Sequence, residues 1–123
     1  MKTILCLLLI PGFFIYLPVT QKECIRITCL DRRDTVLERL GVVRSSFLIE
    51  SLSDTLSGFD IRSSCGCEYP LWKKQMRIYP GHPDTIVILS SIKSFSGYWQ
   101  KQTTITAENC TTIFYTGPWI IIK

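Results

Sequence analysis

The sequence is poor in the residues from which common active sites are built. Its 123 residues contain a single histidine, His82, and neither a GxSxG nor an HExxH motif is present. The sequence therefore gives no support for a serine hydrolase of the α/β type or for a zinc peptidase. His82 lies between Gly81 and Pro83, so we interpret it as a solvated turn residue.

The loops of aspartic proteases are absent as well. Those enzymes share a proton between two carboxylates, which lie on Asp-Thr-Gly or Asp-Ser-Gly loops. Asp54 and Asp84 are each followed by threonine and then by an aliphatic residue in place of glycine. A cysteine nucleophile would have His82 as its one histidine partner. We therefore predict a protein that is not an enzyme and uses no cofactor.

Long apolar runs are missing after the first twenty residues. Lys2 supplies a positive charge, and residues 4–10 begin an apolar stretch in which the pair 11–12 (PG) weakens a helix. The stretch is short for a bilayer span, which needs roughly 20 apolar residues. We expect residues 1–20 to be a signal peptide cleaved near Thr20, which makes the protein secreted and extracellular. Pro18 is unusual at such a site, so a retained anchor is the alternative.

Strong charge of either sign is also lacking. Without Lys2, 13 basic and 10 acidic residues remain, and the excess is dispersed. Arg32 and Arg33, for example, are flanked by Asp31 and Asp34. This balance does not indicate nucleic-acid binding. Residues 21–123 are long enough for a single domain with a modest core.

What the sequence does contain is a series of short β-like runs after Gly41. They are residues 42–51, 59–67, 71–79, 85–95, 98–106, 110–115 and 119–123. Turn-forming glycine, proline and serine residues separate them. Such regular spacing predicts an all-β sandwich or barrel of about seven short strands. The divergent segment 21–41 includes charge-rich residues 31–40, which we expect to form a short helix or an exposed loop.

Two of these runs give more detailed expectations. In residues 72–78, Trp72, Met76 and Ile78 are expected to point inward, with the charged and amide side chains between them in water. Residues 86–89 are continuously apolar, which favours a strand that is covered on both faces.

Five cysteines remain after residue 20, and two of them form the sequence Cys65-Gly66-Cys67. In an extended strand these two side chains share one face, and a bridge between them would close a strained small ring. Each is therefore expected to pair elsewhere. The connectivity stays open, and our preferred scheme joins Cys65 to Cys110 and Cys67 to Cys24 or Cys29. The remaining cysteine is either a free thiol or the link of a disulfide-bonded dimer.

A zinc site made of Cys65, Cys67 and His82 is the metal-binding alternative. The thiols of a secreted protein are oxidised in the secretory pathway, and the sequence lacks further ligands at the spacing that zinc sites use. We therefore predict no metal.

Asn109-Cys110-Thr111 is an N-x-Thr sequon, and Asn109 is the sole asparagine of the chain. A single N-glycan on Asn109 is expected in the secretory pathway, which would make the protein a glycoprotein. The alternative is that early bonding or burial of Cys110 leaves Asn109 unmodified.

Several short sequence motifs occur in the same order and at similar spacing as in a known protein family. They are VVR at 42–44 before LI at 48–49, GF at 58–59 before CGC at 65–67, Pro70, the strand to Tyr79, the apolar run through Ile92, and FYT at 114–116. Over residues 42–123 the chain resembles the prolactin-inducible protein family of secreted exocrine and seminal glycoproteins. The resemblance implies an immunoglobulin-like β-sandwich with two disulfides, in which Cys24 or Cys29 and Cys110 substitute for family cysteines placed elsewhere.

The resemblance also implies extracellular protein binding. Family members associate with immunoglobulin, fibronectin and cell-surface receptors, and Trp72, Tyr79, Tyr98 and Trp99 are the candidate contacts where they reach the surface. Recognition would use an edge strand or an exposed loop. An aspartyl-type protease acting on fibronectin and a small secreted ligand carrier are the alternatives. The protease residue of the family lies in an N-terminal region that this chain does not match.

Overall fold

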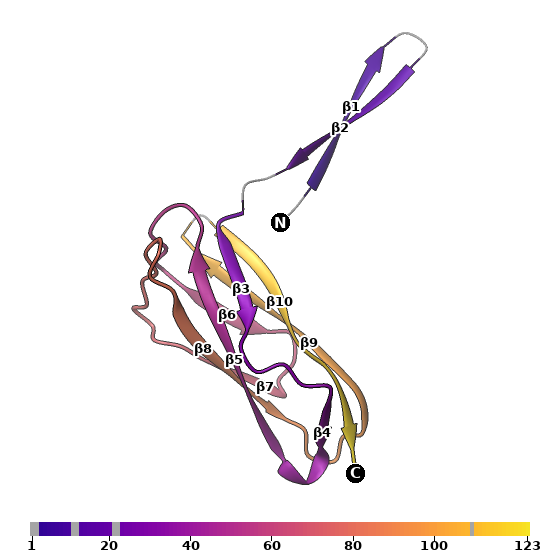
Figure 1. The fold of residues 1–123 in the computed structure, drawn as a ribbon, viewed down its shortest axis with the longest axis vertical. Helices are drawn as coiled ribbons and strands as arrows, with labels where there is room; N and C mark the ends of the chain where they lie inside the picture. Colours follow the sequence, from indigo (N-terminus) through magenta and orange to yellow (C-terminus); the bar gives the residue numbers. More distant parts are fainter. Residues whose placement is uncertain (1–2, 11–12, 21–22, 109) are drawn as a thin grey trace.

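The structure is a computed structural model that describes residues 3–10, 13–20, 23–108 and 110–123 (Figure 1). The first two strands, β1 (Thr3–Ile10) and β2 (Phe13–Thr20), pair with each other in antiparallel register. They span the segment expected to be a signal peptide, and its removal stays a prediction.

The rest of the described chain forms two four-stranded sheets. One sheet has the order β3 (Ile25–Cys29), β5 (Val42–Ser51), β8 (Asp84–Ser91) and β7 (Glu68–Leu71). The other has the order β4 (Thr35–Leu37), β10 (Cys110–Ile122), β9 (Gly97–Ala107) and β6 (Asp60–Ser63). All neighbours are antiparallel except β4, which runs parallel to β10. The predicted all-β class and sandwich-like pair of sheets are confirmed.

Alternating side chains build the core between the sheets. In β5, for example, Val43, Phe47 and Ile49 are buried, while their neighbours along the strand are more exposed. The larger core cluster contains Ile25, Phe47, Ile49, Leu56, Phe59, Ile61, Met76, Ile78, Ile86, Ile88, Ile105, Ala107, Cys110 and Phe114. The smaller cluster contains Val36, Val43, Ile92, Trp99, Trp119 and Ile121.

The strand predicted over residues 71–79 is wrong. The chain is extended earlier, in β7, and then enters a loop in which the Met76 N–H donates to the Lys73 carbonyl. Met76 and Ile78 are nevertheless buried, as expected, because an isolated bridge pairs Ile78 with Leu56. Alternating apolar side chains thus line the core from a loop instead of a regular strand.

Two further segments differ from the predicted secondary structure, one near each end of the domain. Residues 31–40 hold the strand β4 and a 3₁₀ turn, η1 (Glu38–Leu40). The two strands expected at 110–115 and 119–123 are one strand, β10, with a register shift between Thr116 and Trp119. Gly117 permits the shift because its φ is 98°, and a Cβ there would collide with the Trp99 carbonyl oxygen.

The apolar run 86–89 is covered on one face more than on the other. Ile86 and Ile88 are fully buried against the opposite sheet, whereas Val87 and Leu89 are half-buried on the outer face. The expectation of a strand covered on both faces is therefore wrong, because each sheet has a partner on one side.

Candidate functional site

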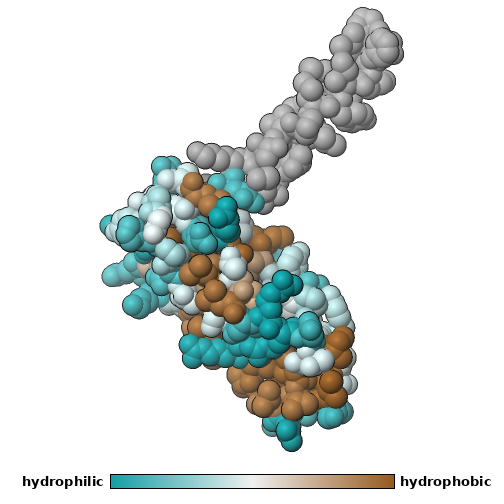
Figure 2. All heavy atoms as spheres, in the orientation of Figure 1, coloured by the Kyte–Doolittle hydropathy of each residue, from teal (hydrophilic) through white to brown (hydrophobic). Residues whose placement is uncertain are grey.

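The outer face of the β4-β10-β9-β6 sheet carries an unusual row of apolar side chains. We name these residues the apolar face; they are Leu37, Tyr98, Ile113, Tyr115, Ile120 and Ile122, each between 41% and 59% exposed. In Figure 2, apolar atoms gather at the end of the sandwich where β4 and the last residues of β10 lie. An outward sheet face is normally polar, so this row indicates a contact surface.

Strand pairing brings four members of the apolar face together at one end of the sheet, while Ile113 and Tyr115 lie farther along β10, opposite Thr104 and Gln102. Ile120 lies opposite Tyr98 on β9, and Ile122 lies opposite Leu37 on β4. Directly opposite residues in a sheet have Cβ atoms about 5 Å apart. The Tyr98 hydroxyl donates to the Gln100 side-chain oxygen over 2.9 Å, which fixes the orientation of its ring.

Buried aromatic residues support the apolar face from behind. Trp119 precedes Ile120 and stacks on Trp99, with ring centroids 6.5 Å apart. The Arg33 guanidinium lies 5.6 Å from the Trp119 ring centroid, and Phe95 meets the Trp99 ring edge-on at 4.9 Å. The strands that carry the apolar face are therefore packed on their inner side against a layer of aromatic rings.

The four aromatic residues predicted as contacts have different positions. Tyr98 is 59% exposed and belongs to the apolar face, and Tyr79 is exposed on the loop before β8. Trp72 is half-buried against the larger cluster. Trp99 is 2% exposed and lies inside the smaller cluster, so it offers no surface to a partner in this fold.

The disulfide pairs differ from the preferred scheme. Cys24 is bonded to Cys110, and Cys65 is bonded to Cys67. The scheme failed because it assumed an extended strand at 65–67. Those residues form the turn between β6 and β7, where the Glu68 N–H donates to the Cys65 carbonyl and the two side chains can meet. Cys29 is a half-buried free thiol among the described residues, and a disulfide-linked dimer stays a prediction.

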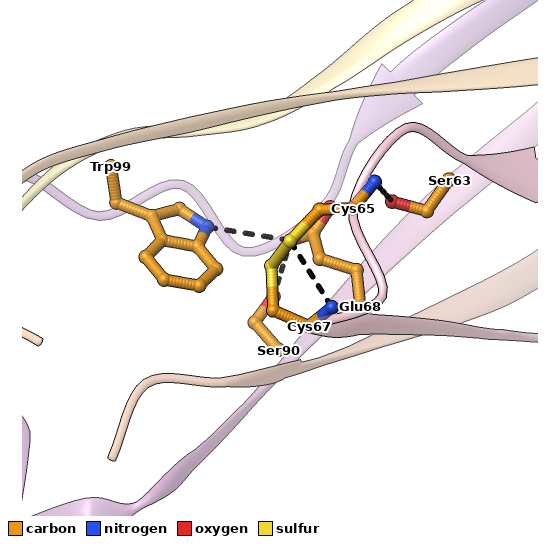
Figure 3. Close-up of a disulfide and its surroundings, with 6 residues drawn as sticks. All are labelled: Ser63, Cys65, Cys67, Glu68, Ser90 and Trp99. Atoms are coloured by element: carbon orange, nitrogen blue, oxygen red, sulfur yellow. Dashed lines mark hydrogen bonds between the residues drawn. A yellow bond between two sulfur atoms is a disulfide. The ribbon is translucent and has the colours of Figure 1, made fainter. Parts of the chain in front are cut away.

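The Cys65–Cys67 bridge has a buried carboxylate for a neighbour (Figure 3). Glu68 follows Cys67 directly and is 3% exposed. Its Oε2 accepts a hydrogen bond from the Ser90 hydroxyl at 2.6 Å and another from Trp99 Nε1 at 3.4 Å. Its Oε1 is buried and has no hydrogen-bond partner among the described residues. A buried oxygen without a donor is uncommon and calls for an explanation.

The residues considered for catalysis are not gathered into one site. Asp54 lines a hollow of about 140 Å³ that also contains Cys24 and Cys110. Asp84 begins β8 and accepts the N–H of Thr85, and His82 lies in its expected turn. No hydrogen bond joins the two carboxylates in the described part of the chain. That hollow is smaller than the roughly 300 Å³ at which sites for drug-sized ligands begin.

Several predictions are not reached by the described residues. Asn109, the expected glycan site, lies outside them. Within the described ranges, no three His, Cys, Asp or Glu side chains are arranged to hold a metal ion. No helix found there has the length and apolar character needed to cross a membrane.

No family model matches the chain, and no curated protein matches it. The site must therefore be interpreted from its own geometry.

Sequence analysis missed Leu37, Ile113, Tyr115, Ile120 and Ile122 as surface residues. The sequence does indicate these residues, because consecutive positions are apolar in the segments VL at 36–37 and WIII at 119–122. Consecutive residues of a strand point to opposite faces of the sheet, so in a two-layer protein some of these apolar side chains must face outward.

Proposed function

We propose that this protein is a secreted, non-enzymatic binding protein with an immunoglobulin-like sandwich. The strand order supports this fold: β3-β5-β8-β7 corresponds to the ABED sheet of that fold, and β6-β9-β10 corresponds to its CFG strands. β4 extends the second sheet beside the last strand. The two disulfides support an oxidising, extracellular location.

The apolar face is the surface through which it binds, and it is the observation that carries the proposal. Aromatic and branched aliphatic side chains dominate the centres of protein interfaces, where they exclude water. Three edge strands are less suited, since β4 has 3 residues, β6 has 4, and β7 contains Pro70, which lacks an N–H. The fourth edge strand, β3, is also short, with 5 residues. The proposal therefore replaces edge-strand recognition with recognition by a sheet face.

The partner is an extracellular protein with an apolar centre and an acidic rim. Arg39, in η1, and Lys123, after β10, are both exposed and flank Leu37 and Ile122 in the chain. Charges at the rim steer association and select a complementary partner. Immunoglobulin and fibronectin, which the resemblance to the prolactin-inducible protein family offers, are the first partners to test.

The test compares two exposed side chains on opposite sheets. Binding of the secreted protein to immobilised immunoglobulin G and fibronectin is measured by surface plasmon resonance. Ile120→Ser is expected to weaken binding at least about tenfold, because it removes the centre of the apolar face. Tyr69→Ser is the matched control, since Tyr69 is 55% exposed on the outer face of the other sheet.

Three outcomes would contradict the proposal. One is binding that neither substitution changes or that both weaken equally, which would remove the apolar face from the interface. Another is the absence of binding to both proteins by the correctly folded wild type. Concentration-dependent self-association, lost in Ile120→Ser, would make a second copy the occupant and would also contradict the proposed partner.

A further inference from the structure

The bridge between Cys65 and Cys67 gains little from chain entropy. A disulfide stabilises a fold mainly by restricting the unfolded chain, and the restriction grows with the length of the closed loop. Here the two cysteines are 2 residues apart, whereas Cys24 and Cys110 are 86 apart. Both Cys65 and Cys67 are partly accessible, and Gly66 between them is exposed. A thiol from solution can therefore approach a bridge that the fold does little to protect.

The turn already holds a donor for a sulfur anion. The backbone N–H of Cys67 donates to Cys65 Sγ at 3.1 Å (Figure 3). Hydrogen bonds to an ionised acceptor are roughly twice as strong as those between neutral groups. The contact therefore strengthens when Cys65 carries a negative charge, which favours Cys65 as the leaving sulfur in an exchange reaction.

Glu68 favours the reduced form for a different reason. A disulfide has no hydrogen to donate, and Glu68 Oε1 is buried without a partner. Reduction would create an S–H donor on Cys67, the neighbouring residue. Cys67 packs against the smaller cluster, of which Trp99 is a member, and Trp99 Nε1 donates to the Glu68 carboxylate. In Figure 3 the Glu68 side chain runs behind the bridge.

We propose that Cys65–Cys67 is an exchangeable disulfide that small thiols of the glutathione class reduce, and that Glu68 shifts the equilibrium toward the dithiol. A first thiolate attacks Cys67 Sγ; its bond to that sulfur forms as the bond to Cys65 breaks, and the electron pair leaves on Cys65. A second thiolate attacks the sulfur of the bound small thiol and releases Cys67. Two small thiols are oxidised to one disulfide, and the two cysteines gain two electrons and two protons.

The equilibrium with glutathione tests the proposal on the intact protein. The protein is equilibrated in buffers with increasing ratios of reduced to oxidised glutathione, alkylated and mapped by mass spectrometry. Cys65 and Cys67 are expected to reach half-reduction in buffers where Cys24–Cys110 stays fully oxidised. Equal resistance of the two bridges would overturn the proposal, and so would a map that joins Cys65 or Cys67 to any other cysteine.

Glu68→Gln isolates the role of the carboxylate. The amide keeps an oxygen for Ser90 and Trp99 and places N–H donors where Oε1 lacked a partner. Because two glutathione molecules reduce one bridge, half-reduction is set by the squared concentration of reduced glutathione divided by the concentration of oxidised glutathione. Glu68→Gln is expected to need about a tenfold higher value of this quantity, which corresponds to the loss of one buried hydrogen bond. Ser63→Ala is the control for loosening of the turn, because it removes the acceptor of the Cys65 N–H. An equal shift in both variants, or none in Glu68→Gln, would overturn the role of Glu68. This inference does not depend on the apolar face.

Discussion

The two disulfides lie beside different parts of the core and act on different scales. Cys24 precedes β3 in one sheet and Cys110 begins β10 in the other, so their bridge joins the sheets beside the larger cluster. Cys65–Cys67 stays within one turn, and Cys67 packs against the smaller cluster. The first bridge is expected to stabilise the fold strongly, because it restrains most of the domain in the unfolded chain. The second closes a minimal loop, so reducing it is expected to change the stability of the fold little.

The two core clusters differ in the charged groups that lie next to them. The larger one is almost wholly aliphatic and aromatic. The smaller one borders charged groups, with Lys101 Nζ at 4.9 Å from the Trp99 ring centroid and the Glu68 carboxylate hydrogen-bonded to Trp99. The buried Glu68 carboxylate, which costs energy to place in a core, thus lies beside the short bridge.

The largest effect is expected from removing the bridge between the sheets. Replacing Cys24 and Cys110 by serine should lower the free energy of unfolding by about 4 to 5 kcal/mol, because a long loop regains its freedom in the unfolded chain. Urea unfolding followed by tryptophan fluorescence measures this loss. A stability close to that of the wild type would contradict the larger contribution that we assign to the Cys24–Cys110 bridge.

A smaller effect is expected where β10 changes register. Gly117→Ala should destabilise the protein by about 2 to 3 kcal/mol, since the residue has a positive φ and the new Cβ meets the Trp99 carbonyl. The same unfolding experiment applies. Gly66→Ala is the matched control, because nothing lies within 4 Å of a Cβ at that position. Equal losses in the two glycine variants would contradict the account of β10.

The smallest effect is expected from the short bridge. Replacing Cys65 and Cys67 by serine should cost about 1 kcal/mol, since the loop they close is minimal. The sharpest measurement compares this variant with the Cys24 and Cys110 variant in one urea series. A loss as large as that of the bridge between the sheets would show that the turn restrains the domain as a whole.

Much of the fold could be predicted from residue alternation. The expected bounds of β5 are the observed ones, and those of β9 differ by one residue at each end, because both strands alternate between buried and more exposed side chains over most of their length. β3 was missed although Ile25 and Ile27 alternate with Arg26 and Thr28. The charge-rich residues 31–40 that follow predict a short helix or an exposed loop, whereas the structure has β4 and η1 there.

The candidate sites depend on a turn and on the pairing of distant strands, and the alternation of apolar and polar residues along the sequence predicts neither. The pairing of Cys65 with Cys67 depends on a turn at Gly66, and the alternating pattern around it resembles a continuing strand. The buried position of Glu68 follows from its place in β7, which begins immediately after that turn. The apolar face requires the pairing of β4 with β10, two strands that are far apart in sequence.

That distance in sequence also sets an order of events during synthesis. Cys24 must wait for Cys110, which at roughly 5 to 20 residues per second leaves its thiol unpaired for roughly 4 to 17 seconds. Cys65 and Cys67 emerge during this interval and are potential wrong partners. While Cys65 and Cys67 are bonded to each other they cannot pair with Cys24, so the short disulfide reduces the number of wrong partners that compete with Cys110.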